Sequence, residues 1–242
     1  MLITGLRPYE LAREVISDMR RLDGWIFTQH SAFQRWLAHN RKAEWYNTQW
    51  KSPNHNLWKV MLHKSSKEDR YIAYTLVNGR YGRYMVRPMS GSSGFSLTVY
   101  IPHFFKRYRQ RMNLGDKLKP EQLMRRYMRN NITAYNVGDN GDVEIVTEEG
   151  IALGYFIFPR LMFVKTFITH EMSKGDQIER YGDGLAKVHD DKDYPESDYA
   201  QNEIRDFVGN LEDYTKRYKE FEQKHKQEKE NGTSNQVDGQ DS

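Results

Sequence analysis

Three residues in the middle of the chain, His103, Arg107 and Arg111, have types and a spacing that suit phosphate chemistry. They recur at every fourth position after Pro102, which places them on one side of a helix. A histidine, with a pKa of about 6.5, can transfer protons at neutral pH, and arginine presents a fork of donors that matches phosphate oxygens. A general base beside two phosphate-holding arginines could cleave a phosphodiester. The alternative is an amphipathic basic helix without a catalytic role.

The helix that opens with "HFFKRYRQR" is followed by a second helical stretch from Pro120 and by three strand-like runs, the last of which contains "VKTFIT". In these elements and their order, residues 100–170 resemble the short toxin-associated domains of the barnase–EndoU–colicin–RelE ribonuclease-like group. The resemblance implies an RNA-cleaving or RNA-binding site formed by His103, Arg107, Arg111 and Thr166. The sequence departs from that group in the long link "MNLGDKLKPEQ" and in its N-terminal elements and acidic tail, which have no counterpart there.

Two further sets of residues could extend this site. His170 follows the last strand and, in strict alternation, shares a face with Thr166, so it could act with His103 as an acid–base pair; the alternative is an exposed strand end. Residues 103–129 also hold nine Lys and Arg against two acidic residues. Phosphate contacts and base stacking are expected of Lys106, Arg109, Arg125, Arg126, Arg129, Tyr108 and Tyr127. Ordinary helix solubilisation explains the same charges equally well.

Charge is distributed unevenly along the chain. Residues 1–170 carry 26 Lys and Arg against 14 Asp and Glu, a balance of +12, whereas residues 171–242 carry 11 against 19, a balance of −8; together they give the net +4. The acidic end could simply solvate a helical tail, or it could screen a surface built for a polyanion. We therefore expect RNA or another polyanion as a partner, with a protein partner as the other possibility.

Several classes of protein are excluded by what the sequence lacks. The chain has no cysteine, which rules out disulfides, a thiol nucleophile and Cys-ligated zinc. "HDDKD" at 189–193 lacks calcium-loop spacing and "GSSG" lacks the lysine of a phosphate loop, so no metal and no cofactor are expected. No apolar run reaches the roughly 18–20 residues of a membrane span, and the N-terminus lacks a signal-peptide core. We expect a cytoplasmic protein without membrane contacts.

The helices and strands that the sequence predicts around these residues indicate an α+β fold. Helices are expected from Arg7 to Asp23-Gly24 and over Thr28–Tyr46, within a helical region 1–50. Strands are expected over 57–63, 71–77, 80–87 and 95–101, with Asn78-Gly79 as a hairpin turn and "PMSGSSG" as a loop. A helix pair, 102–113 and 120–130, then precedes a three-stranded meander over 142–147, 151–158 and 161–169. Whether the two β regions form one sheet or two stays open.

The domain organisation follows the same pattern. We expect a body over residues 1–170, divided into a helical part, a β-rich part at 56–101 and an ααβββ unit at 102–170. An acidic loop region at 171–198, a C-terminal helix at 199–230 with Phe207 in its apolar stripe, and a disordered tail at 231–242 complete the chain.

The sequence is compatible with two functions. The first is a nucleic-acid-acting protein, with metal-independent endoribonuclease activity as its specific form. The second is a non-catalytic protein-interaction or structural component of a larger assembly, for which 16 Tyr and 5 Trp would supply contact surface. The salt dependence of binding distinguishes these two functions. Binding to a polyanion weakens steeply with ionic strength, whereas binding through an aromatic protein interface changes little.

Overall fold

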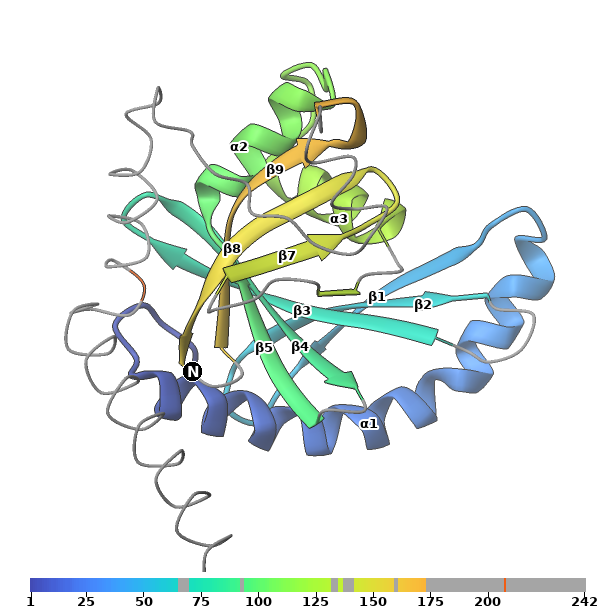
Figure 1. The fold of residues 1–242 in the computed structure, drawn as a ribbon. Helices are drawn as coiled ribbons and strands as arrows, with labels where there is room; N and C mark the ends of the chain where they lie inside the picture. Colours follow the sequence, from blue (N-terminus) through green and yellow to red (C-terminus); the bar gives the residue numbers. More distant parts are fainter. Residues whose placement is uncertain are drawn as a thin grey trace, which may run out of the picture.

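The computed structural model describes residues 1–64, 70–91, 94–131, 135–136, 142–158 and 161–172, together with Phe207. Over these residues the chain is an α+β fold in which one nine-stranded sheet has the order β1-β2-β3-β4-β5-β9-β8-β7-β6 (Figure 1). The first five strands are β1 Trp45–Lys51, β2 Leu57–His63, β3 Arg70–Gly79, β4 Gly82–Gly91 and β5 Gly94–Tyr100. The others are β6 Tyr135–Asn136, β7 Asp142–Val146, β8 Gly150–Phe158 and β9 Leu161–Thr169. The helices are α1 Pro8–His39, α2 Pro102–Arg111, α3 Pro120–Asn130 and the short 3-10 helix η1 His170–Met172.

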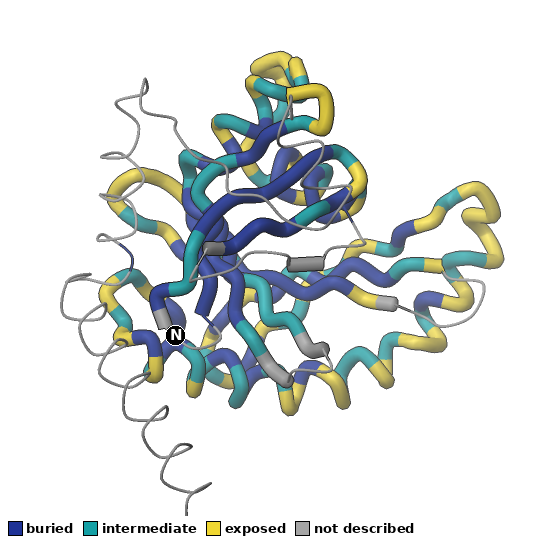
Figure 2. Tube along the Cα trace, viewed as in Figure 1, coloured by how far each residue is buried: buried dark blue, intermediate teal, exposed yellow. Residues whose placement is uncertain are grey.

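Helices cover both faces of this sheet. The strand register places Trp58 and Val99 on one face, whereas Tyr100 lies on the other. Trp58 contacts α1, and the ring of Tyr100 contacts rings of both α2 and α3. Figure 2 shows that buried positions concentrate in the middle of the sheet, while α1 is exposed along its outer side. The core therefore consists of two layers, one on each side of the central strands.

The N-terminal region differs from the prediction. The break at Asp23-Gly24 and the second helix over Thr28–Tyr46 are both wrong, because α1 continues without interruption for 32 residues. The helical region predicted over 1–50 also ends too late, since Trp45–Lys51 is the edge strand β1.

The continuity of α1 has a simple packing cause. Leu11, Leu22 and Phe33 are buried at intervals of eleven residues, which is close to three helical turns. The apolar stripe therefore stays in phase on both sides of Gly24, where an added Cβ would meet only open space. Packing along the whole stripe outweighs the cost of about 1 kcal/mol for a glycine inside a helix.

A buried carboxylate fixes α1 on the sheet. Asp18 has no exposed surface, and its oxygens accept hydrogen bonds from Asn54 Nδ2 at 2.9 Å, Asn56 Nδ2 at 2.7 Å and Trp58 Nε1 at 2.8 Å. Such donors are what a buried charge requires in place of water. One side chain of α1 is thereby tied to β2 and to the turn that precedes it.

The first β region is a meander of hairpins. Leu57–His63 is a strand as predicted, but the turn predicted at Asn78-Gly79 lies two residues later, because β3 runs to Gly79 and pairs it with Gly82. The loop predicted for "PMSGSSG" is wrong in its first half: Pro88–Gly91 belongs to β4 and pairs with β5.

The second β region confirms the predicted meander of β7, β8 and β9 and settles the question of one sheet or two. Leu97–Tyr100 of β5 pairs in parallel with Leu161–Val164 of β9, which joins the two regions into one sheet. The pairing with β5 ends at Val164 of β9. Past this residue, no described strand pairs with the edge of β9 that faces β5. Helix α2 lies along this part of β9 (Figure 1).

Phe207 is the one described residue of the C-terminal region. Its ring lies 4.9 Å from that of Tyr84 and 5.6 Å from that of Phe163, and its carbonyl oxygen accepts a hydrogen bond from Gly5 N at 2.7 Å. The acidic loop, C-terminal helix and disordered tail predicted beyond residue 172 otherwise lie outside the described residues. Within the described part of the chain, no helix has the length and apolar character needed to cross a membrane.

Replacing Asp18 tests how much the buried carboxylate contributes. Asp18→Ala leaves the amide of Asn56 and the indole N–H of Trp58 buried without an acceptor, so we expect a loss of about 2–5 kcal/mol in the free energy of unfolding. Urea denaturation followed by circular dichroism measures it. Asp116→Ala is the control, because an exposed ion pair such as Asp116–Arg109 contributes at most about 1 kcal/mol. Equal losses in the two variants would contradict the role given to Asp18.

Candidate nucleic-acid interface

Helix α2 supplies most of the residues that the sequence singled out. Pro102 occupies the first helical position, where its fixed φ suits a helix start. Phe104, Phe105 and Tyr108 face the core, and none of the ten residues of α2 is acidic. The apolar side is thus used for packing, and the remaining side carries a histidine and four basic side chains.

The structure brings His103, Arg107 and Arg111 together on one side of α2. Partial burial, followed by the nearby charges of Arg107, Lys106 and Arg111, lowers the pKa of His103 to about 4. The imidazole is therefore neutral at pH 7. Arg107 Nη1 also donates to Gln110 Oε1, an exposed side chain one turn further on, at 2.8 Å.

Arg111 connects α2 to the unpaired edge of β9. Its Nη1 donates to Thr166 Oγ1 at 3.2 Å and to the carbonyl oxygen of Phe167. Because β5 has ended before this point, a side chain rather than a strand satisfies that carbonyl. Thr166 thereby joins the group on α2, and Arg111 holds the helix on the sheet as well as adding charge.

His170 does not occupy the strand position that was predicted for it. It begins η1, so the strand alternation that would give it a shared face with Thr166 ends at Thr169. Its Nε2 donates to the carbonyl oxygen of Thr147 at 2.9 Å, which leaves that nitrogen unable to accept a proton. This contact ties the end of β9 to the β7–β8 turn.

The stacking role predicted for Tyr108 and Tyr127 is wrong. Tyr108 has no exposed surface and Tyr127 is 1% exposed, because both rings pack in the aromatic core beneath α2 and α3. Their centroids are 5.0 Å apart, and each also contacts Phe167 of β9. A nucleobase cannot reach either ring, although the helical spacing alone could not distinguish core from surface here.

Arg126 is likewise engaged inside the protein. Its Nη2 lies 3.0 Å from Glu149 Oε1, and its guanidinium lies 5.5 Å from the centre of the Tyr108 ring. Glu149 also accepts hydrogen bonds from Tyr108 Oη at 2.5 Å, Asn130 Nδ2 at 2.9 Å and Asn131 Nδ2 at 3.0 Å. A single carboxylate in the β7–β8 turn therefore joins both helices to the sheet.

Sequence reasoning missed Glu149, and nothing in its local pattern marks it. It is one of two adjacent glutamates in the turn "EEG", and its partners come from α2 and from the end of α3. Burial raises the pKa of its carboxyl, but the hydrogen bonds from Asn130, Tyr108, Asn131 and Arg126 outweigh that effect and leave the pKa below its ordinary value. Glu149 is therefore ionised at neutral pH.

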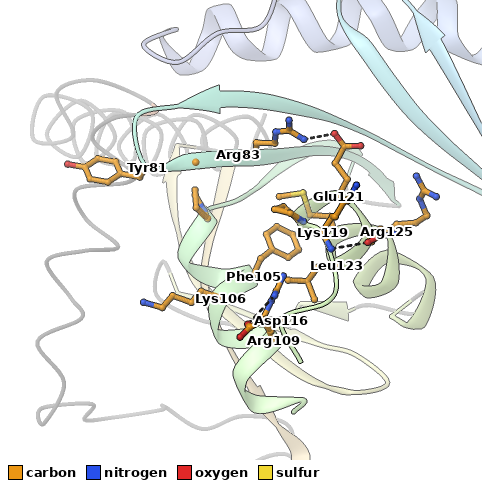
Figure 3. Close-up of a pocket in the computed structure, with 15 residues that line it drawn as sticks. Tyr81, Arg83, Phe105, Lys106, Arg109, Asp116, Lys119, Glu121, Leu123 and Arg125 are labelled. Atoms are coloured by element: carbon orange, nitrogen blue, oxygen red, sulfur yellow. Dashed lines mark hydrogen bonds and ion pairs between the residues drawn. The ribbon is translucent and has the colours of Figure 1, made fainter. Parts of the chain in front are cut away.

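The other predicted contact residues lie next to the histidine–arginine group on α2 and on α3. Lys106, Arg109 and Arg125 line a groove of about 1000 Å³ between α2, the first turns of α3 and the β3–β4 hairpin (Figure 3). Arg129 is exposed near the end of α3, and its Nε donates to Asn130 Oδ1 at 3.4 Å. Of the residues that the structure describes, no three His, Asp or Glu gather closely enough to hold a metal ion.

Comparisons of the chain with protein-family models, with curated proteins and with solved structures give no match. The similarity of residues 100–170 to the ribonuclease-like group therefore stays a prediction.

Glu149→Gln tests the carboxylate that joins the helices to the sheet. A group with a lowered pKa in the folded state stabilises the fold above its unfolded pKa, ordinarily 4.5, and loses that contribution as the pH falls through the folded value. We expect wild type to exceed the variant by about 1–3 kcal/mol at pH 7 and the difference to shrink as the pH falls below 4.5 and through the lower folded pKa. Urea titrations between pH 3 and pH 7 measure this, with the exposed neighbour Glu148→Gln as control. A difference that does not depend on pH would contradict the assignment.

Proposed function

We propose that this protein binds RNA along the polar side of α2. The observation that carries the proposal is the charge of this helix: every ionised side chain in its ten residues is basic. At 100° per residue, the cations from Arg109 through Lys106 and Arg107 to Arg111 cover an arc of about 200°. A helix solubilised by its charges alone would ordinarily mix both signs, as i, i+4 pairs of opposite charge stabilise helices.

The environment of α2 supports phosphate contacts. Lys106 and Gln110 are exposed, and Arg107, Arg109 and Arg111 are partly exposed. Cations in this arrangement neutralise phosphates and release bound counterions, which supplies most of the affinity of many RNA-binding proteins. RNA is preferred over DNA because of the resemblance of residues 100–170 to the ribonuclease-like group. A chain without cysteines also suits a cytoplasmic site of action.

A second function, metal-independent RNA cleavage, is favoured by the state of His103. A neutral imidazole next to Arg107 and Arg111 can accept a proton from a ribose 2′-hydroxyl while the guanidiniums stabilise the charge that develops on the phosphate. The 2′-oxygen then attacks the phosphorus, the bond from phosphorus to the 5′-oxygen breaks, and the departing 5′-oxygen takes a proton from water, which leaves a 2′,3′-cyclic phosphate. A base with a pKa of about 4 is weak, so slow turnover is expected. In this scheme Thr166 orients Arg111 through their hydrogen bond.

Gln110→Glu tests the binding surface without disturbing packing, because Gln110 is exposed in the middle of the polar side. A carboxylate there repels phosphates, so we expect affinity for a single-stranded RNA to fall by about tenfold. Fluorescence anisotropy with a labelled oligonucleotide measures it at several salt concentrations. Wild-type affinity should fall steeply between about 50 and 200 mM salt.

The matched control is Gln34→Glu, the same substitution at an exposed position of α1. Equal effects of the two substitutions would show that net charge, rather than α2, determines binding. Affinity that does not change with salt would favour the alternative, a protein-interaction role without nucleic acid.

His103→Gln tests cleavage. If His103 is the base, EDTA-treated wild type should cleave single-stranded RNA at a rate that rises with pH through about 4 and is level from about pH 5 upward. The variant should lose cleavage while retaining RNA affinity within about threefold, since a neutral imidazole contributes no charge to binding.

His39→Gln is the control, because His39 is an exposed histidine at the end of α1. A rate that instead rises through about pH 6.5 would indicate an ordinary histidine as the base. The absence of cleavage by wild type would limit the function to binding.

A further inference from the structure

We infer that the groove lined by Lys106 and Lys119 is a nucleotide-binding site, in which the base stacks on Tyr81 and the phosphate contacts the two lysines. The inference rests on the proposed RNA binding and deepens it, because it assigns a site for an unstacked nucleotide of the bound strand. None of His103, Arg107 and Arg111 lines the groove, so it is distinct from the candidate catalytic group, although Lys106 lies near both.

The groove is built by elements that are fixed against one another. Its walls are the tip of the β3–β4 hairpin, the outer side of α2, and the α2–α3 link with the first turns of α3. Gly82, with φ +136°, brings the hairpin backbone against Pro102, where an added Cβ would lie 3.3 Å from the proline ring. Arg83 of the hairpin pairs with Glu121 of α3, which closes the other wall. The volume of about 1000 Å³ is at the upper end of the range for small-molecule sites.

The charge of the groove favours an anion. Its lining includes five basic side chains, Arg83, Lys106, Arg109, Lys119 and Arg125, against the acidic Asp116 and Glu121. Both carboxylates are already paired, Asp116 with Arg109 at 3.3 Å and Glu121 with Arg83 and with Lys59. Among the described residues, neither Lys106 nor Lys119 takes part in an ion pair, and both are exposed. These two cations are therefore available to a phosphate.

The rest of the lining suits a base. Figure 3 shows the ring of Phe105 in the middle of the groove and Tyr81 at one end, on the same side as Lys106, with its ring directed outward. The guanidinium of Arg80 lies 5.7 Å from the centre of the Tyr81 ring, and the base is expected on the other face of the ring. Tyr81 is 43% exposed at the tip of the hairpin, whereas Phe105 and Leu123 are almost fully buried and form an apolar floor. An exposed aromatic ring at the rim of a cationic groove is an arrangement with which proteins hold single-stranded nucleic acid. Inorganic anions would use only the lysines, and an acidic peptide would gain little from the ring.

The test is binding of adenosine 5′-monophosphate to the full chain, measured by isothermal titration calorimetry. We expect adenosine 5′-monophosphate to bind more tightly than either adenosine or inorganic phosphate, because only the nucleotide engages both the ring and the lysines. Tyr81→Ala and the double variant Lys106→Gln, Lys119→Gln should each weaken binding by about tenfold.

Matched controls distinguish the groove from general effects. Tyr9→Ala removes an exposed tyrosine of α1, and Lys42→Gln with Lys117→Gln removes two exposed charges that do not line the groove. Both controls should bind adenosine 5′-monophosphate as wild type does. Thermal unfolding of each variant verifies that the fold is intact, as is expected for exposed side chains.

Four results would overturn the inference: no binding of the nucleotide, binding no tighter than that of phosphate, equal weakening in the groove and control variants, or tighter binding of a hexaglutamate peptide. RNA affinity measured in parallel separates the two proposals. RNA binding without nucleotide binding would overturn the inference of a nucleotide site in the groove and leave the proposed RNA binding in place. Nucleotide binding that the groove variants weaken, without RNA binding, supports the groove and overturns the proposed RNA binding.

Discussion

The parallel pairing of β5 with β9 is the constraint on which the rest of the structure depends. It covers only Leu97–Tyr100 and Leu161–Val164, yet it joins the two β regions into one sheet. A parallel pair needs a long crossover connection, and here α2, α3 and the strands β6 to β8 supply it. Because β5 ends at Tyr100 while β9 continues, α2 lies along an unpaired edge, and Arg111 satisfies the carbonyl of Phe167 there.

This position gives the two sides of α2 different environments. Its aromatic side packs with Tyr127 and Phe167 into a dense core, in which ring centroids are 5–6 Å apart. Its other side is held at the edge of that core by Arg111, and by Glu149 through Tyr108. Glu149 pairs with Arg126 of α3 and not with a cation of α2. A cationic helix held in place in this way is preorganised, which lowers the cost of binding a ligand and is consistent with the proposed RNA binding.

The elements were predicted best where the local pattern and the tertiary environment agree. Both helices of the central pair begin at a proline as expected, and the last three strands have nearly the predicted bounds. The errors have physical causes. Asp23-Gly24 locally favours the end of a helix, but the buried stripe of Leu11, Leu22 and Phe33 stabilises a continuous helix across it. The extension of β4 through Pro88–Gly91 depends on pairing with β5, which no local signal reveals.

The α+β class, the grouping of His103, Arg107 and Arg111, and the basic character of α2 could be predicted from the sequence, because helical periodicity and charge are local properties. Which of the other candidate residues remain accessible depends on the packing of the folded chain. Tyr108 and Tyr127 occupy positions that spacing alone leaves ambiguous, and packing against β9 buries them. Arg126 carries the same charge as Arg125, but only Arg126 reaches Glu149, 23 residues away in the chain. Burial and long-range pairing arise from contacts between distant segments, so they become visible only once the chain has folded.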